Sequence, residues 1–200
     1  MKRGTLIAFE GLDGAGKSTQ VERLGQALGA AKCEVVLTRE PTDGPEGQRI
    51  RASARGEAPL SPDEELRCFV EDRDRHVAGT IEPGLRAGKV VVTDRYFLST
   101  VAYQGARGFD WSALLAESEA RFPLPDLVLL LELDPVVGLE RVRERGQAPE
   151  VFEKRGFLER AADIFACIDR DYVARIDARG DPDRVYRAVV ECVRERLDLL

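Results

Sequence analysis

Short apolar runs alternate along the chain with longer segments in which apolar residues recur every three or four positions. The apolar runs predict strands at 5–10, 34–38, 89–94, 127–133 and 172–177. The periodic segments predict helices at 17–30, from 61 to about 84, and at 112–121, 135–145, 152–170 and 182–197. Because continuous apolar strands alternate with helices, we expect a parallel sheet that helices cover on both faces.

The clearest helix start in the sequence is at Ser61. The residues at 61–64, Ser-Pro-Asp-Glu, place an N-cap serine before a proline in the first helical position and a glutamate in the third. Gly79 and Pro83 should weaken the end of this helix.

A glycine-rich loop, GLDGAGKS at 11–18, separates the first predicted strand from the first predicted helix. It matches G-x-x-x-x-G-K-[ST], a loop whose backbone N–H groups bind phosphate together with the positive end of the next helix. We expect Lys17 to reach the β- and γ-phosphates of a nucleotide and Ser18 to hold Mg²⁺. An incidental glycine turn is the alternative. The predicted ATP-binding residues are Gly11, Leu12, Asp13, Gly14, Ala15, Gly16, Lys17, Ser18 and Thr19.

Composition narrows the class of protein. The chain has 200 residues, of which 44% are hydrophobic and 33% charged, as in a globular domain. The net charge of −6 argues against a nucleic acid polymer as partner, although a small anion remains possible. The apolar run at 127–133 is too short to cross a membrane, and no signal peptide is apparent. The cysteines form no C-x-x-C pair, so we expect a cytoplasmic protein with reduced thiols.

Asp94 and Arg95 follow the third predicted strand and should lie in the same crevice as the glycine loop. The aspartate can order Mg²⁺, and the arginine can bind a second phosphate. A surface ion pair is the alternative. A GTPase is not favoured, because the chain has no N-K-x-D. Asp177-Ala-Arg-Gly180 matches D-x-x-G by its letters, but we interpret 177–180 as a strand end and turn. A nucleotide-binding adaptor without catalysis is a further alternative.

The stretch VTDRYFLSTVAYQ at 92–104 resembles the signature of thymidylate kinases, as do FEGLDGAGKST at 9–19, TREP at 38–41 and FVEDR at 69–73. The resemblance implies one P-loop NTPase-like domain over 1–200, with a three-layer α/β fold, a five-stranded parallel sheet and a short helical lid at about 138–153. It also implies a homodimer that phosphorylates dTMP to dTDP with ATP and Mg²⁺ in dTTP synthesis. Another nucleoside-monophosphate or deoxynucleoside kinase is the alternative.

The spacing of Phe69 and Arg73 puts them on one face of the long helix. The resemblance implies that Phe69 stacks on thymine and that Arg73 binds the O4 edge of the base. It also implies that Thr100 and Gln104 face the base and that Tyr103 excludes a ribose 2′-hydroxyl. A core phenylalanine beside a surface arginine is the alternative for the first pair.

The resemblance also assigns residues to the phosphate and sugar of dTMP. Arg39, Arg51 and Arg95 are candidates for binding the phosphate, although Arg51 could belong to a solvated helix face. Asp13 would reach the sugar 3′-hydroxyl, arrange the Mg²⁺ site or cap the loop, and Glu40 would support the arginines. The predicted catalytic residues are Lys17, Asp94, Arg95, Arg141, Arg143 and Arg145, and the predicted metal ligands are Ser18 and Asp94.

The segment GLERVRERGQAPE at 138–150 resembles the arginine-bearing lid of the bacterial enzymes. Some family members carry a basic residue at the position of Gly14, so here the additional cations should come from the lid. Arg141 and Arg145 share a helix face and Arg143 points away from it. A salt-bridged surface helix is the alternative.

Three further residues stand out, two as departures from the family pattern and one as the lone histidine of the chain, on the long helix. Val151 and Ala162 depart from that pattern, which bears on the adenine side of the site and on closure of the lid. His76 shows no evident acid–base partner, and we assign it no catalytic role.

Overall fold

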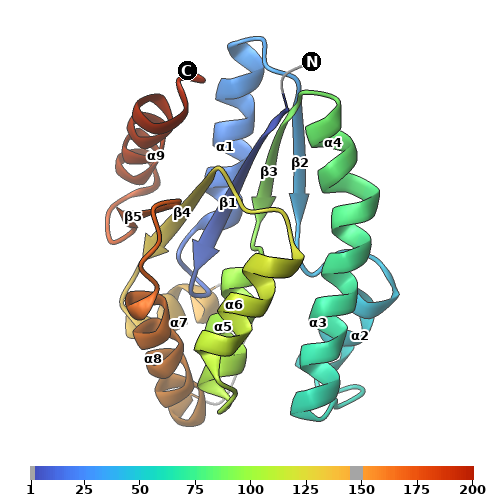
Figure 1. The fold of residues 1–200 in the computed structure, drawn as a ribbon. Coiled ribbons are helices and arrows are strands. Elements are labelled where there is room, and N and C mark those ends of the chain that lie inside the picture. The colour runs from blue at the N-terminus through green and yellow to red at the C-terminus, as the bar shows by residue number, and fades with distance from the viewer. Residues whose placement is uncertain (1–2, 145–150) are drawn as a thin grey trace.

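The computed structural model describes residues 3–144 and 151–200. All strands of its sheet are parallel and lie in the order β2-β3-β1-β4-β5 (Figure 1). The strands are β1 (Thr5–Gly11), β2 (Val35–Arg39), β3 (Val90–Asp94), β4 (Leu127–Glu132) and β5 (Val173–Asp177). The predicted five-stranded parallel sheet is therefore confirmed, with strand ends within one residue of the expectation.

Helices connect the strands and cover both faces of the sheet (Figure 1). They are α1 (Lys17–Ala30), α2 (Pro45–Ala54), α3 (Pro62–His76), α4 (Glu82–Arg86), α5 (Phe97–Ala106), α6 (Trp111–Arg121), α7 (Pro135–Glu144), α8 (Val151–Cys167) and α9 (Pro182–Leu197). Helices α2 and α5 were not predicted. Nearly all of α5 is buried, and α2 buries only three residues, so neither shows the amphipathic period of a surface helix.

Two hydrophobic clusters fill the space between the sheet and its helices. Leu6 and Ala8 of β1 pack toward α5 and α8, whereas Ile7 and Phe9 pack toward α1 and α9. Successive residues of a strand point to opposite faces, so a strand buried on both faces is apolar throughout. This explains the continuous apolar runs in the sequence.

The carboxyl ends of β1, β2 and β3 lie side by side at one edge of the sheet. Asp94 is in register with Phe9 on one side and with Arg39 on the other. The backbone N–H of Arg95 donates to the carbonyl of Phe9 at 2.9 Å, and that of Glu40 donates to the carbonyl of Asp94 at 3.0 Å. The segments that follow the three strands thus start from fixed positions at a common edge.

The long helix begins as its sequence predicts. Ser61 is the N-cap, its hydroxyl oxygen accepts from the N–H of Glu64 at 3.3 Å, and the Glu64 carboxylate accepts from the N–H of Ser61 at 2.9 Å. Toward its end the helix continues through a π-helical turn, Val77–Ile81, into α4. The sequence predicted a weak helix end at Gly79 and Pro83. In the structure the backbone there changes from α-helical to π-helical winding and then forms the short helix α4.

Within residues 3–144 and 151–200, no helix combines the length and the apolar character that crossing a membrane requires. The four cysteines, Cys33, Cys68, Cys167 and Cys192, form no disulfide with one another.

Replacing the N-cap serine tests the start of the long helix. Ser61→Ala removes the acceptor for the Glu64 N–H and should lower the free energy of unfolding by about 1 kcal/mol. Urea denaturation measures the change. The control is Ser118→Ala, in the interior of α6, which should leave the free energy of unfolding unchanged. Equal stability of the two variants would contradict the capping role.

Candidate active site

The phosphate loop adopts the backbone that its glycines predict. Gly14 and Gly16 have φ angles of 83° and 92°, in the left-handed region that glycine occupies at little cost. Lys17 begins α1 and is buried, and its Nζ donates to the carbonyls of Gly11 and Leu12 at 3.1 and 2.9 Å. Burial, with the charge of Arg95, lowers the pKa of Lys17 to about 8. The loop thus holds an ammonium group at the start of a helix, where anions bind.

A close backbone contact explains why position 14 is glycine. A Cβ on Gly14 would lie 2.3 Å from the carbonyl oxygen of Gly138 in α7. A Cβ on Gly138 would in turn lie 2.6 Å from the carbonyl oxygen of Asp13. The loop and the helix that leads to the predicted lid are therefore packed backbone against backbone, and a basic side chain at position 14 does not fit this arrangement.

Ser18 and Asp94, the predicted metal ligands, are in contact. The Ser18 hydroxyl donates to the Asp94 carboxylate at 2.5 Å. Hydroxyl and carboxylate oxygens suit Mg²⁺, which usually takes one or two protein ligands and completes its shell with phosphate oxygens and water. The described residues contain no cluster of three or more His, Cys, Asp or Glu side chains that could hold a metal. The residues present fit a nucleotide-bound Mg²⁺.

Arg95 joins the loop to the turn after β3. Its guanidinium donates to the Asp13 carboxylate at 2.6 Å and to the Ser99 hydroxyl at 2.7 Å, and it lies 5.3 Å from the ring centroid of Tyr103. The Tyr103 oxygen accepts from the N–H of Asp13 at 3.2 Å. Burial alone would raise the pKa of Asp13, but the charges of Arg95 and Lys17 outweigh it and hold this pKa below its ordinary value.

Glu10, which the sequence analysis did not single out, anchors the same turn. Its carboxyl group is fully buried and accepts from the N–H groups of Tyr96 and Ser99 at 2.9 and 3.0 Å, and from the Ser99 hydroxyl. Tyr96 is the N-cap residue of α5, but its side chain does not cap the helix, since its hydroxyl donates to the carbonyl of Pro123. The Glu10 carboxyl group, on β1, accepts from the first N–H groups of α5 instead and so caps this helix. Burial raises the pKa of Glu10 to about 7. The sequence signal that could have identified Glu10 is a glutamate within the apolar run TLIAFEG.

Arg73 is buried among polar partners, with only 2% of its side chain exposed. Its Nε donates to Glu40 at 2.8 Å, and its Nη2 donates to the Thr100 hydroxyl at 2.8 Å and to the carbonyl of Tyr96 at 3.2 Å. Its Nη1 has no hydrogen-bond partner among the described residues. Since buried polar groups are nearly always paired, Nη1 of Arg73 is a candidate for contact with a ligand. The alternative of a surface arginine is wrong.

His76 has the partner that the sequence did not reveal. Its Nδ1 lies 2.9 Å from the Glu40 carboxylate, and its Nε2 lies 2.6 Å from the Thr38 hydroxyl. Glu40 therefore contacts Arg73 and His76 together, and all three side chains are almost fully buried. The prediction that His76 has no evident acid–base partner is therefore wrong. Its partner Glu40 is distant in sequence, and only the fold brings the two residues together.

Phe69 lies on α3, the helix that carries Arg73, and Gln104 lies on α5, which carries the Thr100 partner of Arg73. Phe69 is half-buried one turn before Arg73. Gln104 is buried, its Nε2 donates to Glu65 at 3.4 Å, and its Oε1 has no partner among the described residues. Arg107 forms an ion pair with the same Glu65 at 2.9 Å. Gln104 thus carries a second unpaired polar atom, on the same helix as the Thr100 that accepts from Arg73.

Arg39 and Arg51 come together at a carboxylate that the sequence analysis missed. Each donates to Asp43 at 3.0 Å, and Arg51 also donates to the carbonyl of Pro41 at 2.9 Å. The Arg39 side chain is 65% exposed and that of Arg51 is 32% exposed. Arg51 is therefore held by the loop after β2 and does not belong to a fully solvated helix face.

The predicted lid arginines differ in position. Arg141 donates to the carbonyls of Gly14 and Ala178 at 3.4 and 3.3 Å, so its guanidinium lies beside the phosphate loop. Arg143 is exposed. Arg145 lies outside the described residues, as do the next five residues of the predicted lid and the side chain of Val151.

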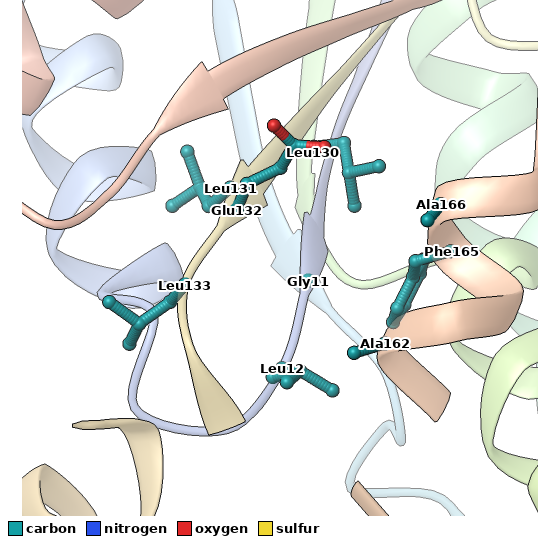
Figure 2. A pocket seen from close by; sticks show the side chains of 9 residues that line it. All are labelled: Gly11, Leu12, Leu130, Leu131, Glu132, Leu133, Ala162, Phe165 and Ala166. Atoms are coloured by element: carbon teal, nitrogen blue, oxygen red, sulfur yellow. The ribbon is translucent and has the colours of Figure 1, made fainter. Parts of the chain in front are cut away.

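A cavity of about 150 Å³ lies between the start of the loop, the end of β4 and helix α8 (Figure 2). Ala162 and Phe165 of α8 face Leu12 across it (Figure 2). Of its nine described lining residues only Glu132 is charged, and Glu132 pairs with Arg175 at 2.6 Å. The cavity is apolar and contains none of the cations that phosphates need, so it is not the phosphate site.

Two consecutive residues connect the phosphate loop to the buried arginine. Arg95 contacts Asp13 of the loop, and the carbonyl of Tyr96 accepts from Arg73. The loop and Arg73 therefore lie on either side of one turn at the carboxyl edge of the sheet. A parallel sheet whose first strand leads into this loop, followed by α1, defines the protein as a nucleotide-binding α/β protein of the P-loop class.

Comparisons with known proteins give the family. The family model for thymidylate kinase matches residues 9–189. The chain is 46% identical over 198 residues to a thymidylate kinase of Xanthomonas euvesicatoria, covering 97% of this chain and 87% of the relative. It is 43% identical over 201 residues to a thymidylate kinase of Xylella fastidiosa, covering 98% of this chain and 92% of the relative. The chain belongs to the thymidylate kinase family.

The raised pKa of Glu10 predicts a pH-dependent contribution to stability. The fold disfavours the ionised form, so the contribution of this group is lost as the pH rises from 4.5 through about 7. Glu10→Gln removes the titration. Measured by urea denaturation, the stability of the wild type relative to this variant should fall by about 3 kcal/mol across that range. Parallel pH profiles of the two proteins would contradict the raised pKa.

Proposed function

We propose that this protein is an ATP-dependent dTMP kinase that produces dTDP for dTTP synthesis. The observation that carries the proposal is the turn Arg95–Tyr96, which touches the phosphate loop on one side and the buried Arg73 on the other. A donor nucleotide at the loop and an acceptor nucleotide at Arg73 would then share one cleft. The names of the relatives support dTMP as the acceptor.

At the donor side, the loop N–H groups and Lys17 bind the β- and γ-phosphates of ATP. Ser18 and Asp94 would hold Mg²⁺, which draws negative charge from the phosphate oxygens when it is bound. Arg141 is placed to add positive charge, because its guanidinium already lies at the carbonyl of Gly14. We propose the same task for Arg143 and Arg145 when the lid covers the nucleotide.

At the acceptor side, the free Nη1 of Arg73 donates to O4 of thymine, and Phe69 stacks on the ring. Thr100 and Gln104 face the base, and Tyr103 fills the space of a 2′-hydroxyl. Asp13 is held beside Tyr103 and would meet the sugar 3′-hydroxyl. Arg39, Arg51 and Arg95 bind the 5′-phosphate, while Glu40 keeps Arg73 in place.

The transfer itself requires positioning and charge stabilisation. An oxygen of the dTMP phosphate forms a bond to the γ-phosphorus of ATP while the bond from that phosphorus to the bridging oxygen of ADP breaks. Lys17 and Arg95 lie on the two sides of this exchange and stabilise the charge on the phosphoryl oxygens. The lid excludes water, which would otherwise compete with dTMP for the phosphoryl group.

We further propose that the protein is a homodimer, as the family resemblance implies, and that it is cytoplasmic, as its cysteine usage suggests. Light scattering of the purified protein measures the assembly: twice the chain mass supports the dimer, and the mass of one chain contradicts it.

A panel of acceptors tests the proposed function. A coupled assay of ADP release should show the highest kcat/KM with dTMP when dTMP, dUMP, dCMP, dGMP and UMP are compared. Lys17→Ala should lose at least about 100-fold in turnover while it keeps its circular dichroism spectrum, because a charge-stabilising group is lost. A better acceptor than dTMP would indicate another nucleoside-monophosphate kinase. Unchanged turnover of the lysine variant would remove Lys17 from the mechanism.

Tyr103 provides a separate test of sugar selection. Tyr103→Ala should raise kcat/KM for UMP relative to dUMP by about 10-fold or more, because the ring no longer occupies the space of the 2′-hydroxyl. Tyr103→Phe keeps the ring and loses only the hydroxyl that meets Asp13, so it should preserve the wild-type ratio. The assignment fails if the alanine variant discriminates as well as the wild type.

A further inference from the structure

His76 lies within a chain of hydrogen bonds that runs from Thr38 to Arg73. Thr38 contacts Nε2 of His76, Nδ1 of His76 contacts one oxygen of Glu40, and Arg73 contacts the other oxygen of Glu40. The His76 and Arg73 side chains are each 2% exposed and that of Glu40 is 4% exposed. Water therefore cannot replace a lost partner among His76, Glu40 and Arg73 without entering the fold, whereas Thr38 is partly exposed.

The chemistry of the groups fixes the direction of these hydrogen bonds. A carboxylate only accepts, so Nδ1 of His76 carries a hydrogen and donates to Glu40. In the neutral ring Nε2 then accepts from the Thr38 hydroxyl, which completes the pairing of His76. Glu40 is fixed at its backbone by the hydrogen bond to the carbonyl of Asp94. The Glu40 side chain is held at its two carboxylate oxygens, one by His76 and the other by Arg73, so His76 helps to fix the plane of the carboxylate.

The carboxylate plane in turn decides where the guanidinium lies. One oxygen of Glu40 receives both Nε of Arg73, at 2.8 Å, and Nη2, at 2.7 Å. Because Nη2 also donates to Thr100, the planar guanidinium of Arg73 is fixed in one position. In this position Nη1 has no partner among the described residues. We propose that His76 is a positioning residue that acts through Glu40 to aim Nη1 of Arg73, and that it thereby selects a pyrimidine with a carbonyl at C4.

The selection follows from the donor-only character of arginine. Thymine presents a carbonyl oxygen at C4, which accepts from Nη1, whereas cytosine presents an amino group there, which cannot. If the guanidinium of Arg73 can rotate or shift away from the base, it loses its hydrogen bond to thymine. The free-energy penalty for placing the cytosine amino group there also becomes smaller. The inference rests on the proposed function, since it takes Arg73 as the group that reads the base.

The test separates the hydrogen-bonding role of His76 from its contribution to packing. His76→Leu fills the space without a donor, and kcat/KM for dTMP should fall roughly 10- to 100-fold through a higher KM for dTMP. The KM for ATP and the turnover at saturating dTMP should change less than about threefold. The ratio of kcat/KM for dTMP to that for dCMP should fall about 10-fold or more.

Three further variants make the result specific. His76→Asn places an amide N–H near the position of Nδ1 and should restore most of the dTMP to dCMP ratio. Val77→Ala, at the adjacent buried position, controls for destabilisation and should leave this ratio unchanged. In an Arg73→Ala background, His76→Leu should have no further effect on the KM for dTMP.

The outcomes distinguish the inference about His76 from the proposed dTMP kinase function on which it rests. If Arg73→Ala leaves the KM for dTMP unchanged, Arg73 does not bind the base and the proposed base site is wrong. If Arg73→Ala raises this KM but His76→Leu does not, the base site holds and the inference about His76 is overturned. If Val77→Ala lowers the dTMP to dCMP ratio as much as His76→Leu, the effect comes from packing and the inference also fails. Thermal melting confirms that each variant is folded at the assay temperature.

Discussion

The turn after β3 is the constraint on which the site depends. Arg95 has a φ angle of 74°, a left-handed conformation that is costly for a side-chain-bearing residue. The fully buried Glu10 stabilises the turn by accepting from the N–H groups of Tyr96 and Ser99. In this conformation Arg95 turns toward the phosphate loop while the carbonyl of Tyr96 meets Arg73. A change in the turn would therefore separate the loop from the base site.

Buried charge marks the acceptor side of this cleft. Arg73 and Glu40 form an ion pair at 2.7 Å with almost no solvent contact. Apolar side chains of similar volume often stabilise a fold as well as such a pair, whereas removing one partner typically costs about 3–5 kcal/mol. Stability alone therefore gives little reason to keep the pair. A reason appears when one nitrogen of the guanidinium is left free for a ligand, as Nη1 of Arg73 is.

Local patterns in the sequence predicted the strands, the phosphate loop and the start of α3, because each depends on residues adjacent in the chain. The missed features arise from contacts between distant segments. Glu10 caps a helix that begins some ninety residues later, and His76 at the end of α3 pairs with Glu40, which follows β2. Asp43 was missed because one exposed acidic residue in a loop resembles any other. The family resemblance supplied Arg73 and Tyr103, whose burial and partners only the fold shows.

A crystal structure with dTMP and a non-hydrolysable ATP analogue tests the central claim most directly. It should show O4 of thymine within hydrogen-bonding distance of Nη1 of Arg73. The dTMP phosphate should lie beside Arg95, facing a γ-phosphate that is held by Lys17. The account is contradicted if dTMP binds away from the turn and leaves Nη1 of Arg73 unpaired, because the loop and the buried arginine would then not serve one reaction.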